Sequence, residues 1–275
     1  MKVKVSSVLQ KLFVYIVAVI FFFPFVISIL PAVKSKQETR QGVLSLPKTI
    51  HWENFTDAIE KANIWNSMGN SLILTVFSVI LVIIVASLAG YGIARMYKNK
   101  WFRMYETVLM AAMMVPFQTL MIPIYKMLKA LGLMNTLPGA IILVAGFNMP
   151  FAIMMFIGFV RTIPIELEEA AYLEGCGRVK IFYSIIFPLL KPITTTIAVL
   201  DALWAWNEFN VSLLVLQKNE VKTIPIQQYV FFGEHSSNYN MAFAAAVITM
   251  IPIVIFFILA QKHIVEGMTS GAVKG

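Results

Sequence analysis

Long stretches without charge dominate the pattern of this chain. A helix that crosses a bilayer needs about 20 mostly apolar residues. Five windows of about that length or longer contain no Asp, Glu, Lys or Arg, at 12–33, 62–94, 107–125, 130–160 and 235–261. A sixth apolar stretch at 193–216 is interrupted by Asp201 and Glu208. The runs do not alternate with the period of two that marks a membrane β-strand. The pattern therefore predicts an all-α membrane protein with six transmembrane helices.

The composition agrees with this prediction. Hydrophobic residues make up 59% of the 275 residues and charged residues 13%, about half the charge of a soluble domain. If the N-terminus is cytoplasmic, the inside segments carry 13 lysines and arginines, and the longer outside segments carry 9. Basic residues concentrate in cytoplasmic loops, so both termini are expected on the cytoplasmic side of the membrane.

The net charge of +8 is explained by this asymmetry and by anionic lipid headgroups. No nucleic-acid partner is expected, and membrane lipid is. The run at 12–33 is longer than the core of a signal peptide, and no small-x-small cleavage site follows it. We expect it to remain as the first span.

Candidate catalytic chemistry is sparse along the sequence. There is no G-x-x-x-x-G-K-[ST] phosphate loop, and not even a Gly–Lys pair. His51, His235 and His263 are scattered without the spacing of metal ligands. Cys176 is the single cysteine, so an intrachain disulfide is impossible. We expect a transport or pore-forming subunit that is not an enzyme, holds no metal or other cofactor, and takes its energy from another polypeptide.

An acidic, small-residue segment interrupts the apolar runs at "ELEEAAYLEGCG", residues 166–177. Pro164 suits a first helical turn, and glutamates there are favoured by the helix dipole. Gly175 and Gly177 are expected to end the helix. The segment predicts a helix of about three turns over 164–177, followed by a second helical stretch that ends at the prolines near 188. Such a helix suits the groove of a partner protein, and a solvated connecting helix is equally consistent.

The stretch "EAAYLEGCGRVKIFYSIIFPLLKP" (169–192) resembles the EAA loop of ABC-importer membrane subunits. Three further stretches of this chain resemble the carbohydrate branch of the family, the MalG-like permeases. They are "NSLILTVFSVILVIIVASLAGYGIAR" (70–95), "WNEF" (206–209) and "QKHIVEGMTSGAVKG" (261–275). The likeness covers nearly the whole chain. It departs from the family pattern at Glu174, where Asp is usual, and at Cys176, where Ala is usual.

The resemblance implies the type I ABC importer (MetI-like) permease fold. It implies as partners a second homologous permease, a cytosolic ABC ATPase dimer that holds ATP and Mg, an extracytoplasmic solute-binding protein and an oligosaccharide substrate. Residues 1–69 would form the first span with an extracellular loop, 70–262 the transport core with the coupling loop 161–192, and 263–275 a cytoplasmic tail. The ATPase-coupling residues would be Glu168, Glu169, Ala170, Ala171, Glu174 and Gly175.

Asp201 and Glu208 are charged residues within a span, and such residues usually face a polar cavity or a partner. They lie seven residues apart and therefore on one helical stripe. An aromatic ring beside amides and carboxylates could stack on a sugar and bond its hydroxyls. The candidate substrate path is Asn148, Trp204, Asn207, Glu208 and Asn210. Hydrogen bonding between helices is the alternative, and it is the preferred interpretation for Asp201.

The loop at 217–240 joins the last two spans. In MalG-like subunits this loop reaches toward the substrate-binding protein. The candidate contacts are Gln228, Tyr229, Phe231 and Gly233. A plain connecting loop is the alternative.

Three rival functions remain open at this stage. The same importer architecture could carry an amino acid or a polyamine, although "WNEF" and the tail favour a sugar. An ATPase-independent carrier would show internal repeats and coupling charges in several spans, and neither is evident. A purely structural membrane subunit is also compatible with the sequence.

Overall fold

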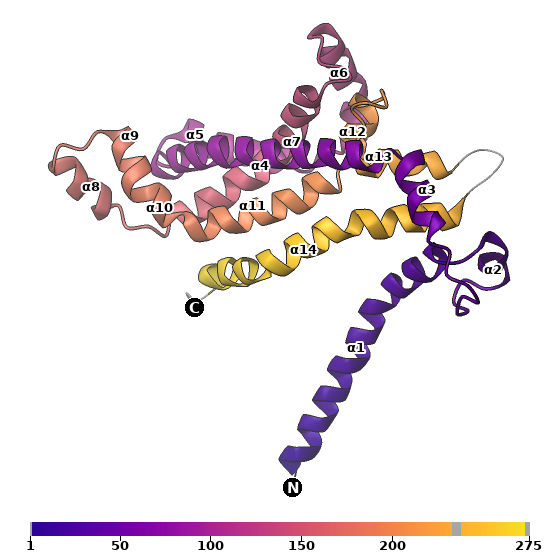
Figure 1. Ribbon diagram of the computed structural model, residues 1–275. Helices are drawn as coiled ribbons and strands as arrows, with labels where there is room; N and C mark the ends of the chain where they lie inside the picture. The colour runs from indigo at the N-terminus through magenta and orange to yellow at the C-terminus, as the bar shows by residue number, and fades with distance from the viewer. Residues whose placement is uncertain (1, 233–237, 273–275) are drawn as a thin grey trace. The chain divides into compact units, whose positions relative to one another are not determined.

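The computed structural model describes residues 2–232 and 238–272, with side chains described for 8–232 and 238–262. Every regular element in this part of the chain is a helix (Figure 1). The chain forms two compact units. The first contains residues 1–67 and 227–252, and the second contains 68–226 and 253–275. The predicted N-terminal region 1–69 thus corresponds to only part of the first unit. This unit also includes 227–252, which contains the start of the last helix.

The first unit contains α1 (Lys2–Ala32), α2 (Lys36–Gln41), α3 (Glu53–Lys61), η2 (Gln228–Phe231) and the first part of α14 (Tyr239–Ala272). Its loop folds around Lys34, whose side chain is fully buried. The Lys34 ammonium donates to the carbonyl oxygens of Gly42 and Val43 at 3.0 and 2.9 Å and to Ser45 Oγ at 3.1 Å. Asn240 in α14 donates to the carbonyls of Pro31 and Lys34, both at 2.8 Å. These bonds satisfy the buried polar groups of the loop.

The second unit contains most of the helices. It contains most of α4 (Ile64–Arg95), then α5 (Lys100–Ala112), α6 (Phe117–Ala130), α7 (Leu137–Val160), α8 (Glu166–Leu173), α9 (Arg178–Ile181), η1 (Phe182–Ile186), α10 (Phe187–Leu189), α11 (Lys191–Trp206), α12 (Asn210–Val215) and most of α13 (Ile224–Gln227). Helix α7 lies beside α5, α11 and α12. Helices α8 and α9 lie at one end of this bundle (Figure 1).

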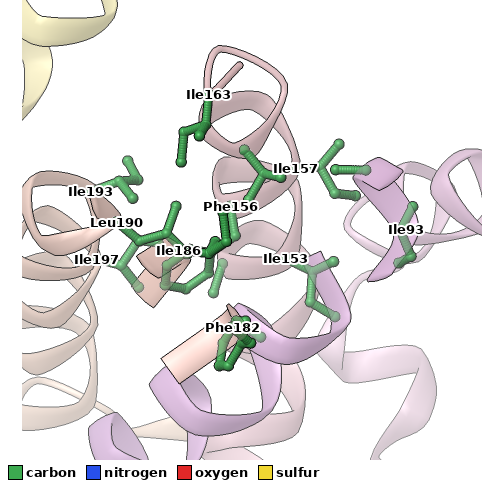
Figure 2. Close-up of a cluster of buried hydrophobic side chains, with 14 of the residues drawn as sticks. Ile93, Ile153, Phe156, Ile157, Ile163, Phe182, Ile186, Leu190, Ile193 and Ile197 are labelled. Atoms are coloured by element: carbon green, nitrogen blue, oxygen red, sulfur yellow. The ribbon is translucent and has the colours of Figure 1, made fainter. Parts of the chain in front are cut away.

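The core of the second unit surrounds Phe156, which is fully buried (Figure 2). Ile186, Leu190 and Ile197 pack around it from the segments that follow the acidic helix. Gly90 lets α4 approach α7 closely, because a Cβ at this position would lie 2.5 Å from the Cβ of Phe156. Backbones that come this close need a residue without a side chain.

Four helices are long and apolar enough to span a membrane: Val8–Ala32, Ile64–Arg95, Leu137–Val160 and Tyr239–Lys262. Two further predicted spans are bent pairs, so the described chain has up to six spans. Lys100–Ala112 and Phe117–Ala130 meet at 104°, and Arg178–Leu189 and Lys191–Trp206 meet at 73°. The all-α membrane fold is confirmed, but the spans predicted at 107–125 and 193–216 are not single straight helices.

Two of the departures from the predicted spans have a local cause. Pro116 has no N–H and sits at the N-cap of α6, where the helix must restart. The predicted span at 130–160 begins at Leu137 instead, because Gly132 and Asn135 adopt positive φ of 69° and 59°. Thr136 then caps α7 by accepting from the Gly139 N–H at 3.2 Å. Helix α11 ends at Trp206, and α12 begins only at Asn210.

Candidate functional site

The acidic segment forms α8, which is shorter than predicted. The helix covers Glu166–Leu173 rather than 164–177. The chain turns away from the helix at Gly175, whose φ of +82° is in the left-handed region that favours glycine. The Cys176 N–H donates to the Ala171 carbonyl and the Gly175 N–H to the Tyr172 carbonyl, both at 3.0 Å. This pair of bonds is a Schellman cap.

Gly177 was predicted to help end the helix, and that prediction is wrong. Its φ of −71° and ψ of 157° are extended, and it is the N-cap of α9. One glycine therefore stops the acidic helix, and the other starts the next one.

Helix α8 has two different faces. Ala171 is buried and belongs to the core of the second unit. Glu169, Ala170 and Glu174 are exposed. Leu173 is 89% exposed, and Tyr172 beside it is 66% exposed. Large apolar side chains in such exposure, next to carboxylates, are typical of a surface that another protein covers.

Glu168 does not share the exposed face. Its carboxylate accepts a hydrogen bond from the Tyr91 hydroxyl at 2.6 Å and pairs with Arg95 Nε at 2.7 Å. The side chains of Arg95 and Glu168 are 16% and 13% exposed. Arg95 also donates to the Ile163 carbonyl at 3.0 Å. Glu168 was grouped in sequence with the other coupling residues, yet the structure turns it toward α4.

A cleft of about 630 Å³ lies between the end of α4 and the α8–α9 segment. Its walls include Arg95, Glu168, Glu169, Tyr172 and Arg178. The Tyr91–Arg95–Glu168 group bridges the two walls, because its donors come from α4 and its acceptor from α8.

The segment after α8 is wound irregularly. It contains the π-helix η1 between α9 and α10. Pro188 lacks the N–H of a regular helix bond, and the wider turn lets the chain continue past it to Leu190. Phe182 in η1 is buried, and its ring centroid lies 5.3 Å from that of Tyr91. π-helical turns are frequent at functional sites.

A second site lies where α7, α11 and α12 meet. A cavity of about 160 Å³ is lined by four of the five predicted substrate-path residues, Asn148, Trp204, Glu208 and Asn210, together with apolar side chains that include Phe117 and Phe147. The fifth, Asn207, is exposed and outside this lining, and its amide donates to the Leu203 carbonyl at 2.8 Å. The structure thus brings Asn148 of α7 together with residues of α11 and α12 that lie more than 50 positions later in the sequence.

The acidic groups near this cavity have defined partners. Asn148 in α7 donates to Asp201 Oδ1 in α11, and Asp201 is 2% exposed. This bond between helices agrees with the preferred interpretation of Asp201. Glu208 Oε1 accepts from the Val211 N–H at 2.6 Å, so it also satisfies a free donor at the start of α12.

The predicted binding-protein loop is described in part. Gln228 donates to Thr249 Oγ1 at 2.8 Å, and Phe231 is buried, so both stabilise the first unit. Tyr229 is 60% exposed. Gly233 lies outside the described residues. Within residues 8–232 and 238–262, whose side chains are described, no group of three or more His, Cys, Asp or Glu side chains is placed to hold a metal ion.

Comparison with known proteins identifies the family. The model of the binding-protein-dependent transport system inner membrane component matches residues 83–270. The chain belongs to this family. The resemblance to carbohydrate ABC permeases is confirmed by relatives along nearly the whole chain. The melibiose/raffinose/stachyose import permease MelC of Bacillus subtilis is 39% identical over 94% of both chains. The probable starch-degradation-product permease AmyC of Thermoanaerobacterium thermosulfurigenes is 33% identical over 99% of both.

Solved structures agree on the fold. A chain of a bacterial ABC transporter that imports the acidic polysaccharide alginate has a TM-score of 0.78 at 23% identity, covering 94% of this chain and 96% of that one. The MetNI methionine ABC transporter gives a TM-score of 0.53 at 16% identity, covering 74% of this chain and 95% of that one. These likenesses confirm the MetI-like importer permease fold. The permease is a multi-pass protein of the bacterial inner membrane, and its family is that of non-catalytic membrane subunits.

Sequence reasoning missed Tyr91 and Arg95 as site residues. Their spacing of four residues places them on one face at the end of a long span. Arg95 had been counted only as one basic residue in the orientation of the chain.

Proposed function

We propose that this permease is one of two membrane subunits of an ATP-driven, binding-protein-dependent importer of oligosaccharides. The observation that carries the proposal is the near full-length likeness to permeases named for melibiose, raffinose and stachyose and for starch degradation products. A third relative, MsmG of Streptococcus mutans, is named for multiple sugar-binding transport and is 33% identical over 93% of the chain. The family assignment favours this reading over an ATPase-independent carrier.

The exposed face of α8 is the proposed attachment point for a cytosolic ATPase dimer, which holds ATP and Mg. Glu169 supplies a carboxylate for a charge-assisted bond, and Ala170 permits close approach. Leu173 and Tyr172 supply apolar area at the end of the helix. Gly175 fixes the angle at which the chain leaves α8. The segments on the same side of the membrane as α8 and both termini hold more Lys and Arg than the opposite segments, which supports placing them in the cytoplasm.

The cavity at Trp204 is the proposed contribution of this subunit to the substrate path. Ligand pockets usually measure about 300–1,000 Å³, so a cavity of about 160 Å³ accommodates part of a saccharide and leaves the rest to the second permease. The Trp204 side chain is 44% exposed and offers an apolar face for stacking. Glu208, Asn148 and Asn210 offer polar groups to hydroxyls. Tyr229 in the loop before α14 is the exposed candidate for contact with the binding protein.

Co-purification and uptake test this proposal together. The permease, the second permease, the ATPase and the binding protein from the same organism are co-expressed and reconstituted in liposomes. Uptake of labelled melibiose, raffinose, stachyose and maltotriose is then measured. We expect ATP-dependent uptake of at least one of them, and none by this chain without its partners.

Glu169→Ala and Gly175→Val should abolish most of the uptake while the four-component complex still assembles. Glu60→Ala in α3, an exposed glutamate outside α8, is the matched control and should transport normally. Normal uptake by both α8 variants, or the absence of an ATPase from the purified complex, would overturn the coupling role.

A further inference from the structure

The Tyr91–Arg95–Glu168 group is an ion pair reinforced by a phenol hydroxyl and shielded from solvent. The Glu168 carboxylate uses one oxygen for Arg95 and the other for Tyr91, at 2.7 and 2.6 Å. Short bonds of this type, in which the acceptor is charged, are roughly twice as strong as neutral ones. Both members of the ion pair are less than one-fifth exposed, so water and salt screen them weakly.

The group adds a polar bridge between α4 and α8, which also share an apolar core that contains Ile93, Ala94 and Ala171. Tyr91 and Arg95 belong to the last turns of α4, and Glu168 belongs to α8. The cleft of about 630 Å³ runs between these elements. On the cleft side of that core, the bridge links the two walls directly and therefore influences the angle between them.

Tyr91 and Arg95 also fix the segments on either side of α8. Arg95 donates to the Ile163 carbonyl, which precedes α8. The ring of Tyr91 contacts Phe182, which follows it. The same two residues of α4 thus hold the entry, the body and the exit of the acidic loop.

We propose that Tyr91, Arg95 and Glu168 form a fixed joint that makes α8 and α4 move as one rigid body when the ATPase moves α8. This inference rests on the proposed function. Glu168 is then a positioning residue that faces the membrane core, whereas Glu169 contacts the ATPase. Without the joint, α8 would still dock, but its displacement would be absorbed in the cleft rather than transmitted to α4.

Paired spin labels test the rigidity of the joint directly. In a Cys176→Ala background, Glu166→Cys in α8 and Lys98→Cys just after α4 provide two exposed labelling positions. The distance distribution is measured on the complete complex, with and without ATP plus vanadate. We expect one narrow distribution that ATP does not shift. Glu168→Gln and Tyr91→Phe should each broaden it, and saccharide transported per ATP hydrolysed should fall about fivefold or more.

A double variant separates a specific joint from general damage. Arg95→Glu with Glu168→Arg restores opposite charges across the cleft, and it should narrow the distribution and recover part of the transport per ATP. Tyr91→Phe with Glu168→Gln should cost less than the sum of the two single losses, because both remove the same interaction. Retention of the ATPase and the second permease on purification shows that each variant has folded.

Two results would overturn the inference. One is a distribution in Glu168→Gln as narrow as that of the parent protein. The other is equal broadening by Glu169→Gln, which changes an exposed carboxylate on the same helix and serves as the matched control. Failure of the proposed function has a different signature, in which no variant, and not even the parent chain, retains an ATPase.

Discussion

The acidic residues of α8 and those near the end of α11 are used in opposite ways. Glu168 is held by a full positive charge and a phenol hydroxyl. Asp201 is held through one oxygen by a neutral amide, and its other oxygen, Oδ2, is buried and has no hydrogen-bond partner among the described residues. The first arrangement resists movement, because separating opposite charges is costly in a shielded place. The second leaves capacity for rearrangement next to a cavity. A carboxylate with both oxygens bonded and one with a single bonded oxygen thus lie at different places in one unit.

The largest effect is expected from breaking the ion pair on one side. Arg95→Met leaves the Glu168 carboxylate without its cation and should lower the free energy of unfolding by about 3 kcal/mol. Thermal unfolding of the detergent-solubilised complex measures the change. Arg95→Met with Glu168→Met should recover most of this stability, because loss of both partners of a buried pair is often nearly neutral. If transport per ATP recovers as well, the pair matters for stability and not for coupling.

The second-largest effect is expected from disturbing the close packing of α4 against α7 at Gly90. Gly90→Val would push a side chain into Phe156 and the Ile153 carbonyl and should destabilise the complex by about 2 kcal/mol. Gly158→Ala in α7 is the control, since an added Cβ there meets nothing within 4 Å. Size-exclusion profiles and unfolding temperatures of the two variants should differ clearly. Equal profiles would mean that α4 and α7 do not approach as closely as the structure shows.

A smaller effect is expected at the cavity. Trp204→Ala removes the ring proposed to stack on the saccharide, and uptake should fall about fivefold, equivalent to about 1 kcal/mol. Asn207→Ala, which lies on the same helix end but outside the cavity lining, should change uptake less than twofold. Initial uptake rates at several sugar concentrations show whether the loss is in affinity or in turnover. A larger loss in Asn207→Ala would place the substrate path on the other face of α11.

The smallest effect is expected for the Asn148–Asp201 bond. Asp201→Ala leaves the Asn148 amide without its partner and should cost about 0.6 kcal/mol, the average for hydrogen bonds between membrane helices. Asp201→Asn retains an acceptor oxygen, so its free energy of unfolding should lie within about 0.3 kcal/mol of that of the parent protein. A severe loss of transport in Asp201→Asn with unchanged stability would reveal that the charge itself takes part in transport.

Helices and family could be read from the sequence because they depend on long, regular signals. The charge-free windows predicted the spans, and the segment at 169–192 carried the resemblance to the family. The breaks within spans were harder to place. Pro116 marks the break between α5 and α6, but the 104° angle depends on how the following helix packs, which no local pattern records.

The direction in which each side chain points was the main feature that the sequence did not predict. Glu168 and Glu169 are neighbours of the same type, so composition gives them the same role. Their directions differ by about 100° around the helix, and the partners that decide between them are Tyr91 and Arg95, more than 70 residues earlier. Gly175 and Gly177 show the same limit, because φ separates a helix stop from a helix start and is set by the hydrogen bonds around each glycine.

The burial of Lys34 changes the charge that the loop presents once it has folded. While the chain is being inserted and the loop is unfolded, this lysine acts as an ordinary cation beside the first span. Once the loop has closed, carbonyls and a hydroxyl surround the ammonium, and no surface of it remains for headgroups or counterions. The mature protein therefore presents one fewer positive charge beside α1 than its nascent chain did. An amine-reactive reagent should modify Lys34 during synthesis and miss it afterwards.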